Sequence, residues 1–239
     1  MVRQPRRVAG KLSEPVIRDI ADSIVTGEIE PGQALPPESV ICEEFGVSRT
    51  VVRESLQRLA EKGLLSAQQG RGTIVTERSQ WNLLDPVVLA AMVAHDDSLG
   101  ILDEVALIRA SLESEMAAAV AASASTVVVE ELRARLDAQH AAVKKRQKFR
   151  DADLAFHQAI IDASGNRLGR AIARRLVGEA LTSDRFHGDV DDTVVVATLD
   201  EHEAILEAIA ARDPERAREL MKSHVDIAWQ RRRRPRASA

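Results

Sequence analysis

This 239-residue sequence is poor in aromatic side chains. It contains four phenylalanines, two tryptophans and no tyrosine, so that aromatic residues make up 3% of a chain that is 45% apolar. A core of this composition must be mainly aliphatic. Alanine-rich stretches such as residues 116–122 indicate helices that pack closely together. The length allows one large domain or two ordinary ones.

Cysteine is nearly absent, and long apolar runs are missing altogether. Cys42 is the only cysteine, which excludes an intrachain disulfide and indicates a reducing compartment. We interpret it as a packing residue of a helix, with redox sensing as the alternative. No apolar stretch follows the charged first residues, and no run is long enough to span a bilayer. We therefore expect a cytoplasmic protein with no membrane partner.

Charge is divided unevenly along the chain. Residues 1–78 hold 11 basic and 11 acidic side chains, whereas residues 79–230 hold 17 and 26. Residues 231–239 add five arginines, which we interpret as a disordered, solvated basic tail. Because an acidic region is repelled by nucleic acid, any contact with DNA should be confined to the N-terminal part.

That N-terminal part contains a helix-turn-helix pattern. Pro36 and Pro37 precede Glu38, which places a carboxylate in the first turn of a helix. Gly46 tolerates the positive φ of a sharp turn, and Ser48 is a good N-cap for a second helix. Before the pair, an amphipathic stripe predicts a leading helix that ends near Gly27; its members are Ile17, Ile20, Ala21 and Ile24.

The second helix of the pair has two different faces. Its apolar residues Val52, Leu56 and Leu59 recur at helical spacing and should point inward. Its polar residues Arg49, Arg53 and Gln57 lie on the opposite side, where a recognition helix meets DNA. A two-stranded wing should follow, with Arg71 between two glycines at its tip, suited to a minor groove. The alternative is a helix pair that carries only a solvated charged face.

Residues 13–76 resemble the winged helix-turn-helix of the GntR family of bacterial transcription regulators. The likeness runs without a gap through LPPESVICEEFGVSRTVVRESLQRLAEKGLLSAQQGRGTIV. Many relatives carry an arginine where this chain has Ser39. The DNA contact made by that arginine is therefore not expected here. The resemblance implies DNA-binding roles for seven residues: Ser48, Arg49, Thr50, Arg53, Gln69, Gly70 and Arg71.

The second half of the chain is helical in pattern, because glycine and proline are scarce between Asp103 and Trp229. Asp213 before Pro214 marks one helix start, and a Ser-Gly-Asn sequence marks a break in which Asn166 caps the next helix. The predicted helices span residues 86–93, 99–122, 126–148, 150–163, 166–186, 193–212 and 214–231.

Within this half, three histidines and one carboxylate share inward-facing helix stripes. Asp153 and His157 are four residues apart, on the face of Phe156. His202 and His224 lie on the apolar faces of two later helices. A single buried histidine is usually a hydrogen-bonded core residue. Four such groups buried together are costly without a shared partner, and they suit a divalent transition metal.

The same region resembles the FCD ligand-binding domain of the FadR subfamily. The likeness lies in VALIRASLESEMAAAVAA, FRDADLAFHQAIIDASGN and DEHEAILEAIAARDPERARELMKSH. In metal-binding members the ligands fall on the positions of Asp153, His157, His202 and His224, all of which are present. The resemblance implies a metal, with zinc as the first expectation and nickel, manganese or iron as alternatives.

A metal with four protein ligands keeps one or two positions open for water or an acidic effector. Arg109 is our first candidate to orient a carboxylate, although it could instead form an ion pair with Glu113, four residues on. Arg150 and Arg185 are further candidates. His95, His140 and His187 have no partners in the pattern, and we interpret them as surface or structural residues.

We therefore predict a mainly α protein, with a winged helix-turn-helix joined to an all-α bundle. The predicted parts are a flexible tail (1–10), a DNA-binding domain (11–78), a linker with a connecting helix (79–98), an FCD-type metal and effector domain (99–230) and the basic tail (231–239). We expect a homodimeric repressor that is not an enzyme and binds palindromic operator DNA.

We expect its effector to be a small organic acid. The segment WNLLDPVVLAAMVAH resembles relatives that respond to sugar acids. Three alternatives for the metal remain. It could serve a metal-dependent enzyme, be the sensed signal itself, or act as a structural staple.

Overall fold

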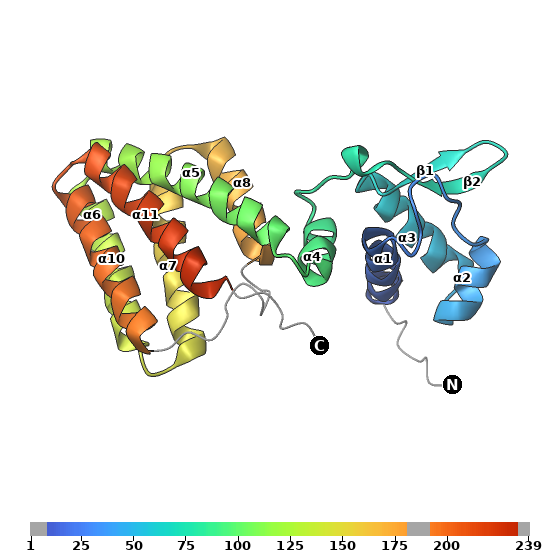
Figure 1. Cartoon of the computed structure of the whole chain (residues 1–239), viewed down its shortest axis with the longest axis horizontal. Helices are drawn as coiled ribbons and strands as arrows, with labels where there is room; N and C mark the ends of the chain where they lie inside the picture. The colour runs from blue at the N-terminus through green and yellow to red at the C-terminus, as the bar shows by residue number, and fades with distance from the viewer. Residues whose placement is uncertain (1–8, 181–191, 234–239) are drawn as a thin grey trace, which may run out of the picture. The chain divides into compact units, whose positions relative to one another are not determined.

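The computed structural model describes residues 9–180 and 192–233, and the side chains of residues 12–176 and 192–233. The chain divides into two compact units, Met1–His95 and Asp96–Ala239 (Figure 1). The described residues are helical apart from one two-stranded sheet, which confirms the predicted fold class. None of the described helices is long and apolar enough to cross a membrane.

The first unit is a winged helix-turn-helix followed by one more helix. Its elements are α1 (Ala9–Thr26), α2 (Glu38–Phe45), α3 (Arg49–Glu61), β1 (Leu65–Gln68), β2 (Gly72–Val75), a 3-10 turn η1 (Arg78–Gln80) and α4 (Pro86–His95). The apolar stripe of α1 is buried as predicted. Because α4 packs against α1, the connecting helix expected in the linker belongs to this unit.

Local chemistry sets the turn of the helix pair. α2 begins at Glu38, as predicted, and ends at Phe45; the cap that follows is Gly46, whose φ of 62° is left-handed. Ser48 then caps α3, its Oγ accepting a hydrogen bond from the backbone N–H of Val51. β1 and β2 pair antiparallel, and the turn between them passes through Gly70 at a φ of 77°.

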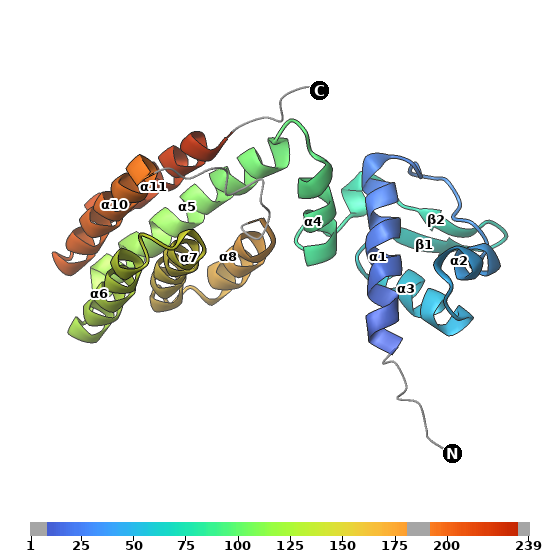
Figure 2. The ribbon, with the colours of Figure 1, turned by 90° about the horizontal axis from the view of Figure 1, so that it is seen from below.

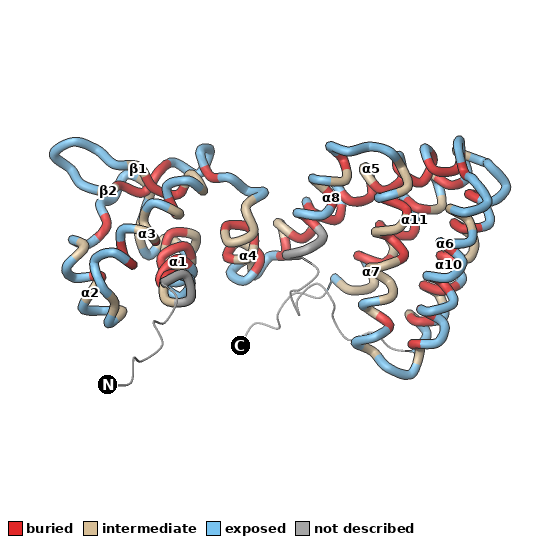
Figure 3. The backbone as a smooth tube through the Cα atoms, turned by 180° about the vertical axis from the view of Figure 1, so that it is seen from behind, coloured by how far each residue is buried: buried red, intermediate tan, exposed pale blue. Residues whose placement is uncertain are grey.

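The second unit is a bundle of helices. Its described members are α5 (Gly100–Ser123), α6 (Thr126–Ala141), α7 (Arg146–Ala163), α8 (Arg167–Ala180), α10 (Asp192–Ala210) and α11 (Pro214–Arg232). α10 and α11 lie on one side of the long α5, and α7 and α8 lie on the other (Figure 2). The helices bury their inward faces and expose their outward ones (Figure 3).

The bundle core is aliphatic, as the composition predicts. Phe149 and Phe156 are its aromatic members among the described residues, and leucine, isoleucine and valine fill most of the rest. Ala117, Ala121 and Ala217 are fully buried and carry short side chains, which let the backbones of α5 and α11 approach closely.

Two neighbouring helix boundaries are predicted wrongly. The helix expected over residues 126–148 ends at Ala141, and the next begins at Arg146 instead of residue 150. No glycine or proline marks this break. Its physical reason is that α6 and α7 pack against each other, which the two halves of one continuous helix could not do. The expected end of the helix over 166–186 lies outside the described residues, and its start is capped by Asn166 as predicted, through the N–H of Gly169.

The basic tail also differs from the prediction at its beginning. α11 continues to Arg232, and Arg231 forms an ion pair with Glu201 at 2.8 Å. The guanidinium of Arg233 binds the carboxylate of Asp103 at 2.7 Å, and the indole N–H of Trp229 donates to the same carboxylate. A disordered run from residue 231 is therefore incorrect for these arginines; residues 234–239 lie outside the described part. At the other end, α1 already begins at Ala9, inside the expected flexible tail.

Candidate metal centre and DNA-binding surface

Three buried histidines from three helices meet in the centre of the bundle. His157 comes from α7, His202 from α10 and His224 from α11. The Nε2 atom of His224 lies 3.2 Å from Nε2 of His157 and 3.1 Å from Nε2 of His202. The structure thus brings together the three histidines that the sequence singled out.

The opposite nitrogen of each ring has a partner of its own. Each Nδ1 faces a side-chain oxygen at 2.6–2.8 Å: His157 faces Glu113, His202 faces Gln139, and His224 faces Glu201. The amide of Gln139 is oriented by Asp153, because its Nε2 donates to Oδ1 of that carboxylate at 3.1 Å. We therefore assign the ring proton of all three histidines to Nδ1.

This assignment leaves three lone pairs on Nε2 atoms that point at one another. Such an arrangement is repulsive unless a cation lies between the nitrogens. Ligands about 2.0–2.1 Å from one zinc ion are separated by about 3.3 Å in tetrahedral geometry, close to the observed spacings. Histidine ligands whose second nitrogen donates to a carboxylate or amide oxygen are typical of metal sites. The residues present therefore fit a divalent metal.

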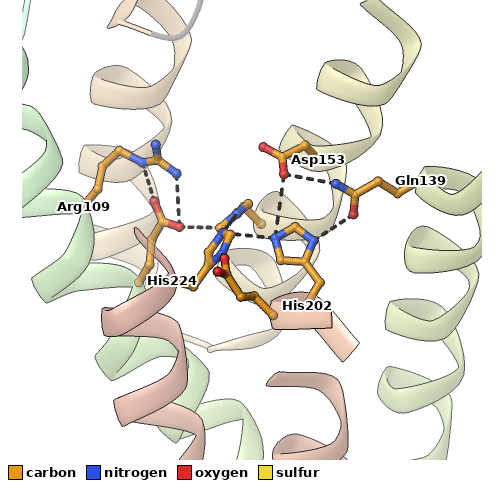
Figure 4. Close-up of polar contacts among 8 residues, drawn as sticks. Arg109, Gln139, Asp153, His202 and His224 are labelled. Carbon is orange, nitrogen blue, oxygen red and sulfur yellow. Dashed lines mark hydrogen bonds and ion pairs between the residues drawn. The ribbon is translucent and has the colours of Figure 1, made fainter. Parts of the chain in front are cut away.

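Asp153 completes the set that the sequence predicted. Its Oδ1 lies 3.7 Å from Nε2 of His202, and Figure 4 shows the carboxylate with Gln139 beside His202. Burial alone would raise the pKa of Asp153. The groups packed around it, His202 and His157 first and then Arg232, outweigh the effect of burial and hold that pKa well below its usual range. Asp153 is thus an anionic oxygen donor next to the three nitrogens.

Electrostatics favours neutral imidazoles at this position. Burial lowers the pKa of His202 well below its usual value, and the charge of His224 acts in the same direction against the attraction of Asp153. Burial also lowers the pKa of His224. At neutral pH both rings therefore keep a lone pair available for a cation.

Arg109 lies beside the three histidines. It is paired with an acidic residue, and it also lines a cavity. Its Nε donates to Glu113 at 2.7 Å, so the ion pair anticipated from the sequence is present (Figure 4). Burial would raise the pKa of Glu113, but the charge of Arg109 and the interaction with His157 lower it to about 2. Arg109 also lines a cavity together with Asp153, His157 and His224. Arg150 lies on α7 but is not among the residues that line this cavity. Arg185 is outside the described residues.

Sequence reasoning did not assign the residues that hold the imidazole rings. The sequence indicates Glu113 only as a partner of Arg109, and no pattern in it singles out Gln139 or Glu201. Glu201 directly precedes His202 in the chain but binds His224 across the helix pair. Of the other histidines, His95 has its Nε2 atom 3.2 Å from the carboxylate of Asp22 on α1, His140 is exposed, and His187 is outside the described residues.

The expected DNA-binding residues form an exposed surface at the start of α3 and on the wing. All seven are exposed: Ser48, Arg49, Thr50, Arg53, Gln69, Gly70 and Arg71. Val52 and Leu59 on the opposite face of α3 are fully buried, as predicted. A helix start with exposed N–H groups and arginines suits phosphate and base contacts.

Two of these arginines have partners within their own domain. Nε of Arg53 donates to both oxygens of Glu38, at 2.9 and 3.2 Å. The guanidinium of Arg71 donates to the side chain of Gln68 and to the carbonyl of Gly32, at 3.2 and 3.3 Å. Contact of either arginine with DNA would therefore compete with an interaction that already exists.

Comparison with known proteins identifies similar chains. Residues 12–75 match the family described as bacterial regulatory proteins, gntR family, and residues 104–227 match the FCD domain. The chain is 28% identical to the galactonate operon transcriptional repressor of Escherichia coli K12, over 86% of this chain and 90% of the relative. It is 32% identical to the uncharacterized HTH-type transcriptional regulator YieP of the same organism, over 86% and 89%.

A solved structure shares the fold over nearly its full length. The Listeria monocytogenes protein Lar, which controls expression of the agr system, aligns with a TM-score of 0.63 at 17% identity. The alignment covers 96% of this chain and 98% of Lar.

Proposed function

This chain belongs to the GntR family of bacterial transcription regulators, with an FCD domain after its winged helix, and we propose that a small carboxylate bound at a metal centre controls its affinity for operator DNA. Its relatives are transcription regulators and not enzymes, and several are repressors. Repression is therefore the activity that we propose for this chain.

The observation that carries this proposal is the convergence of three Nε2 atoms whose rings are fixed by Glu113, Gln139 and Glu201. We propose His157, His202, His224 and Asp153 as the ligands of one divalent transition metal, with zinc as the first expectation. When bound, the metal supplies a Lewis-acidic position for an anionic oxygen. Nickel, manganese and iron remain alternatives that the same donor set would accept.

The effector that we propose is a small organic acid. Its carboxylate would take the open position of the metal, and Arg109 at the cavity would orient it. The similarity to a galactonate operon repressor supports a sugar acid as one class to test. Arg109 already pairs with Glu113, so its guanidinium would bridge the effector and a residue that holds His157.

DNA recognition would use α3 and the wing in a homodimer. Two copies of α3, about 34–36 Å apart, would enter successive major grooves of a palindromic operator. The effector would control DNA binding only if its affinity differs between two arrangements of the dimer, one that binds the operator and one that does not.

A binding titration in four conditions tests this proposal. The operator is first selected from random DNA with the full chain, and its affinity is then measured by fluorescence anisotropy with and without zinc and with and without galactonate. We expect the acid to change operator affinity only when the metal is present. An effect of zinc alone would identify a metal sensor, and metal-independent binding of the acid would contradict the metal as part of the effector site.

A further inference from the structure

An ion pair joins the two helices of the helix-turn-helix on its exposed surface. Glu38 stands in the first turn of α2, and Arg53 lies about one turn into α3, which packs against α2 (Figure 1). Nε of Arg53 donates to both carboxylate oxygens of Glu38, at 2.9 and 3.2 Å. An arginine that we expect to touch DNA is therefore held by a residue to which the family resemblance gives no role.

The hydrogen bonds to Glu38 leave the end of the Arg53 guanidinium open. Both use Nε, and neither terminal amino group is hydrogen-bonded within the part of the chain that the structure describes. The side chain of Arg53 is 71% exposed, so these amino groups can be reached from solvent. Two N–H donors on one planar group match O6 and N7 of guanine in the major groove. A base can thus bind one end of Arg53 while Glu38 keeps the other.

The pair also restricts how Arg53 can bind the DNA backbone. An exposed ion pair adds little to the stability of a fold, so its main consequence here is the direction in which the guanidinium points. A phosphate that took over Nε would leave the carboxylate of Glu38 unpaired beside like charges, which is costly. A base contact through the amino groups keeps the pair, and an arginine that is already held loses less conformational freedom on binding.

We infer that Glu38 determines sequence specificity, by holding Arg53 in a position that reads one guanine of the operator and by opposing its use as a general phosphate contact. Glu38 is a positioning residue, because it acts through Arg53 and not through a contact of its own with a base. This inference goes beyond the control by metal and acid proposed above, and it rests only on the recognition of DNA by α3.

Base preferences, measured one operator position at a time, test the inference. The operator is selected from random DNA with the wild-type full chain, and each of its positions is then changed singly. Affinities are measured by fluorescence anisotropy. The position read by Arg53 is the one whose preference disappears in Arg53→Ala. The wild type should prefer guanine to adenine there by about 10- to 100-fold, which is the range for one bidentate base contact.

Glu38→Gln keeps the shape of the side chain but removes the charge that holds Arg53. We expect it to lose most of the guanine preference at this one position, and to bind unrelated DNA more tightly than the wild type. Its plot of log affinity against log salt should become steeper by about 0.9, because a released Arg53 gains a phosphate contact. In the Arg53→Ala background, Glu38→Gln should change no base preference.

Glu43→Gln is the matched control, because it removes an exposed carboxylate from the same helix. It should keep the guanine preference and nearly the same salt dependence as the wild type. The midpoint of thermal unfolding is measured for each variant, so that a change in base preference is read only from folded protein.

The outcomes separate this inference from the proposed function. Full guanine preference in Glu38→Gln would overturn the inference, and so would an equal loss at every operator position or the same changes in Glu43→Gln. An Arg53→Ala variant that keeps every base preference would overturn it as well. All of these results would leave control by metal and acid standing. Failure of the wild type to select any operator would overturn both.

Discussion

Each histidine of the candidate metal centre has a neighbour at both nitrogens of its imidazole ring. One nitrogen of each histidine points to the centre, and the other donates to Glu113, Gln139 or Glu201. Gln139 is the neutral member of these three, and Asp153 fixes the orientation of its amide. The orientation of His202 therefore depends on a residue that is not itself a proposed ligand.

Replacing Gln139 tests this dependence. Gln139→Leu keeps the side-chain volume but removes the acceptor for the Nδ1 proton of His202. We expect the affinity for zinc to fall about 10- to 100-fold, as for other residues that orient metal ligands, when measured by competition with a chromogenic chelator. Gln147→Leu on the exposed start of α7 is the control. Equal zinc affinity in the two variants would contradict this positioning role.

On the first unit, Arg49 is a residue that we expect to read a base of the operator. It is exposed in the first turn of α3, next to the cap formed by Ser48. Arg49→Ala should weaken binding to the selected operator by about 1–3 kcal/mol if this arginine reads a base. Arg58→Ala, near the other end of α3, should have a much smaller effect, as measured by anisotropy at fixed salt. Equal losses in both variants would indicate general charge attraction instead of base recognition.

The residues that the sequence predicted and those it missed differ in kind. Asp153, His157, His202 and His224 follow from helix faces and from a family resemblance, and the structure brings them together. The partners of the ring nitrogens cannot be predicted in this way, because they lie on helices whose rotation is set only by packing. Gln139, for example, approaches His202 from α6, 63 positions away along the chain.

At the scale of helices and strands, periodicity and capping predict most elements. The cap of Asp213 at α11 and the stripe of α1 are both present. The break between α6 and α7 was missed because it contains neither glycine nor proline, so nothing local opposes a continuous helix. The packing of α6 against α7 requires it instead. Arg231 and Arg233 were misassigned for a related reason, since their acidic partners lie far away in the sequence.

The contact between the end of α11 and the start of α5 should stabilise the fold to an extent that depends on pH. The hydrogen bond from Arg233 lowers the pKa of Asp103; burial opposes this, and the indole of Trp229 lowers it further. Because the folded value lies below the unfolded one, the carboxylate stabilises the fold above about pH 4 and ceases to do so as the pH falls through the folded value.

The variant Asp103→Asn measures this effect. The wild type should melt at a higher temperature than the variant at neutral pH, and the difference should shrink below about pH 4. Asp151→Asn, an exposed carboxylate on α7, should show no comparable difference. A difference between wild type and Asp103→Asn that is unchanged at about pH 3 would contradict the assignment.

At the scale of the whole molecule, the proposed metal would link three helices of the second unit, which supply His157, His202 and His224. Its removal should lower the thermal midpoint of that unit, because a ligand bound only to the folded state stabilises it by about 2.7 kcal/mol at 100 times its dissociation constant. The measurement is calorimetry of the full chain before and after dialysis against chelator, with zinc added back as the control. An unchanged midpoint would contradict metal binding to the folded bundle, whereas unfolding at room temperature would favour the structural staple.

The most direct test of the metal centre is the metal content of the purified full-length chain. Elemental analysis by mass spectrometry is applied to the wild type, to His202→Ala and to the control His140→Ala, whose histidine is exposed and outside the cluster. We predict about one transition-metal ion per chain in the wild type and in the control, and almost none in His202→Ala. A wild type that stays metal-free after incubation with zinc, or normal metal content in His202→Ala, would contradict the proposed centre.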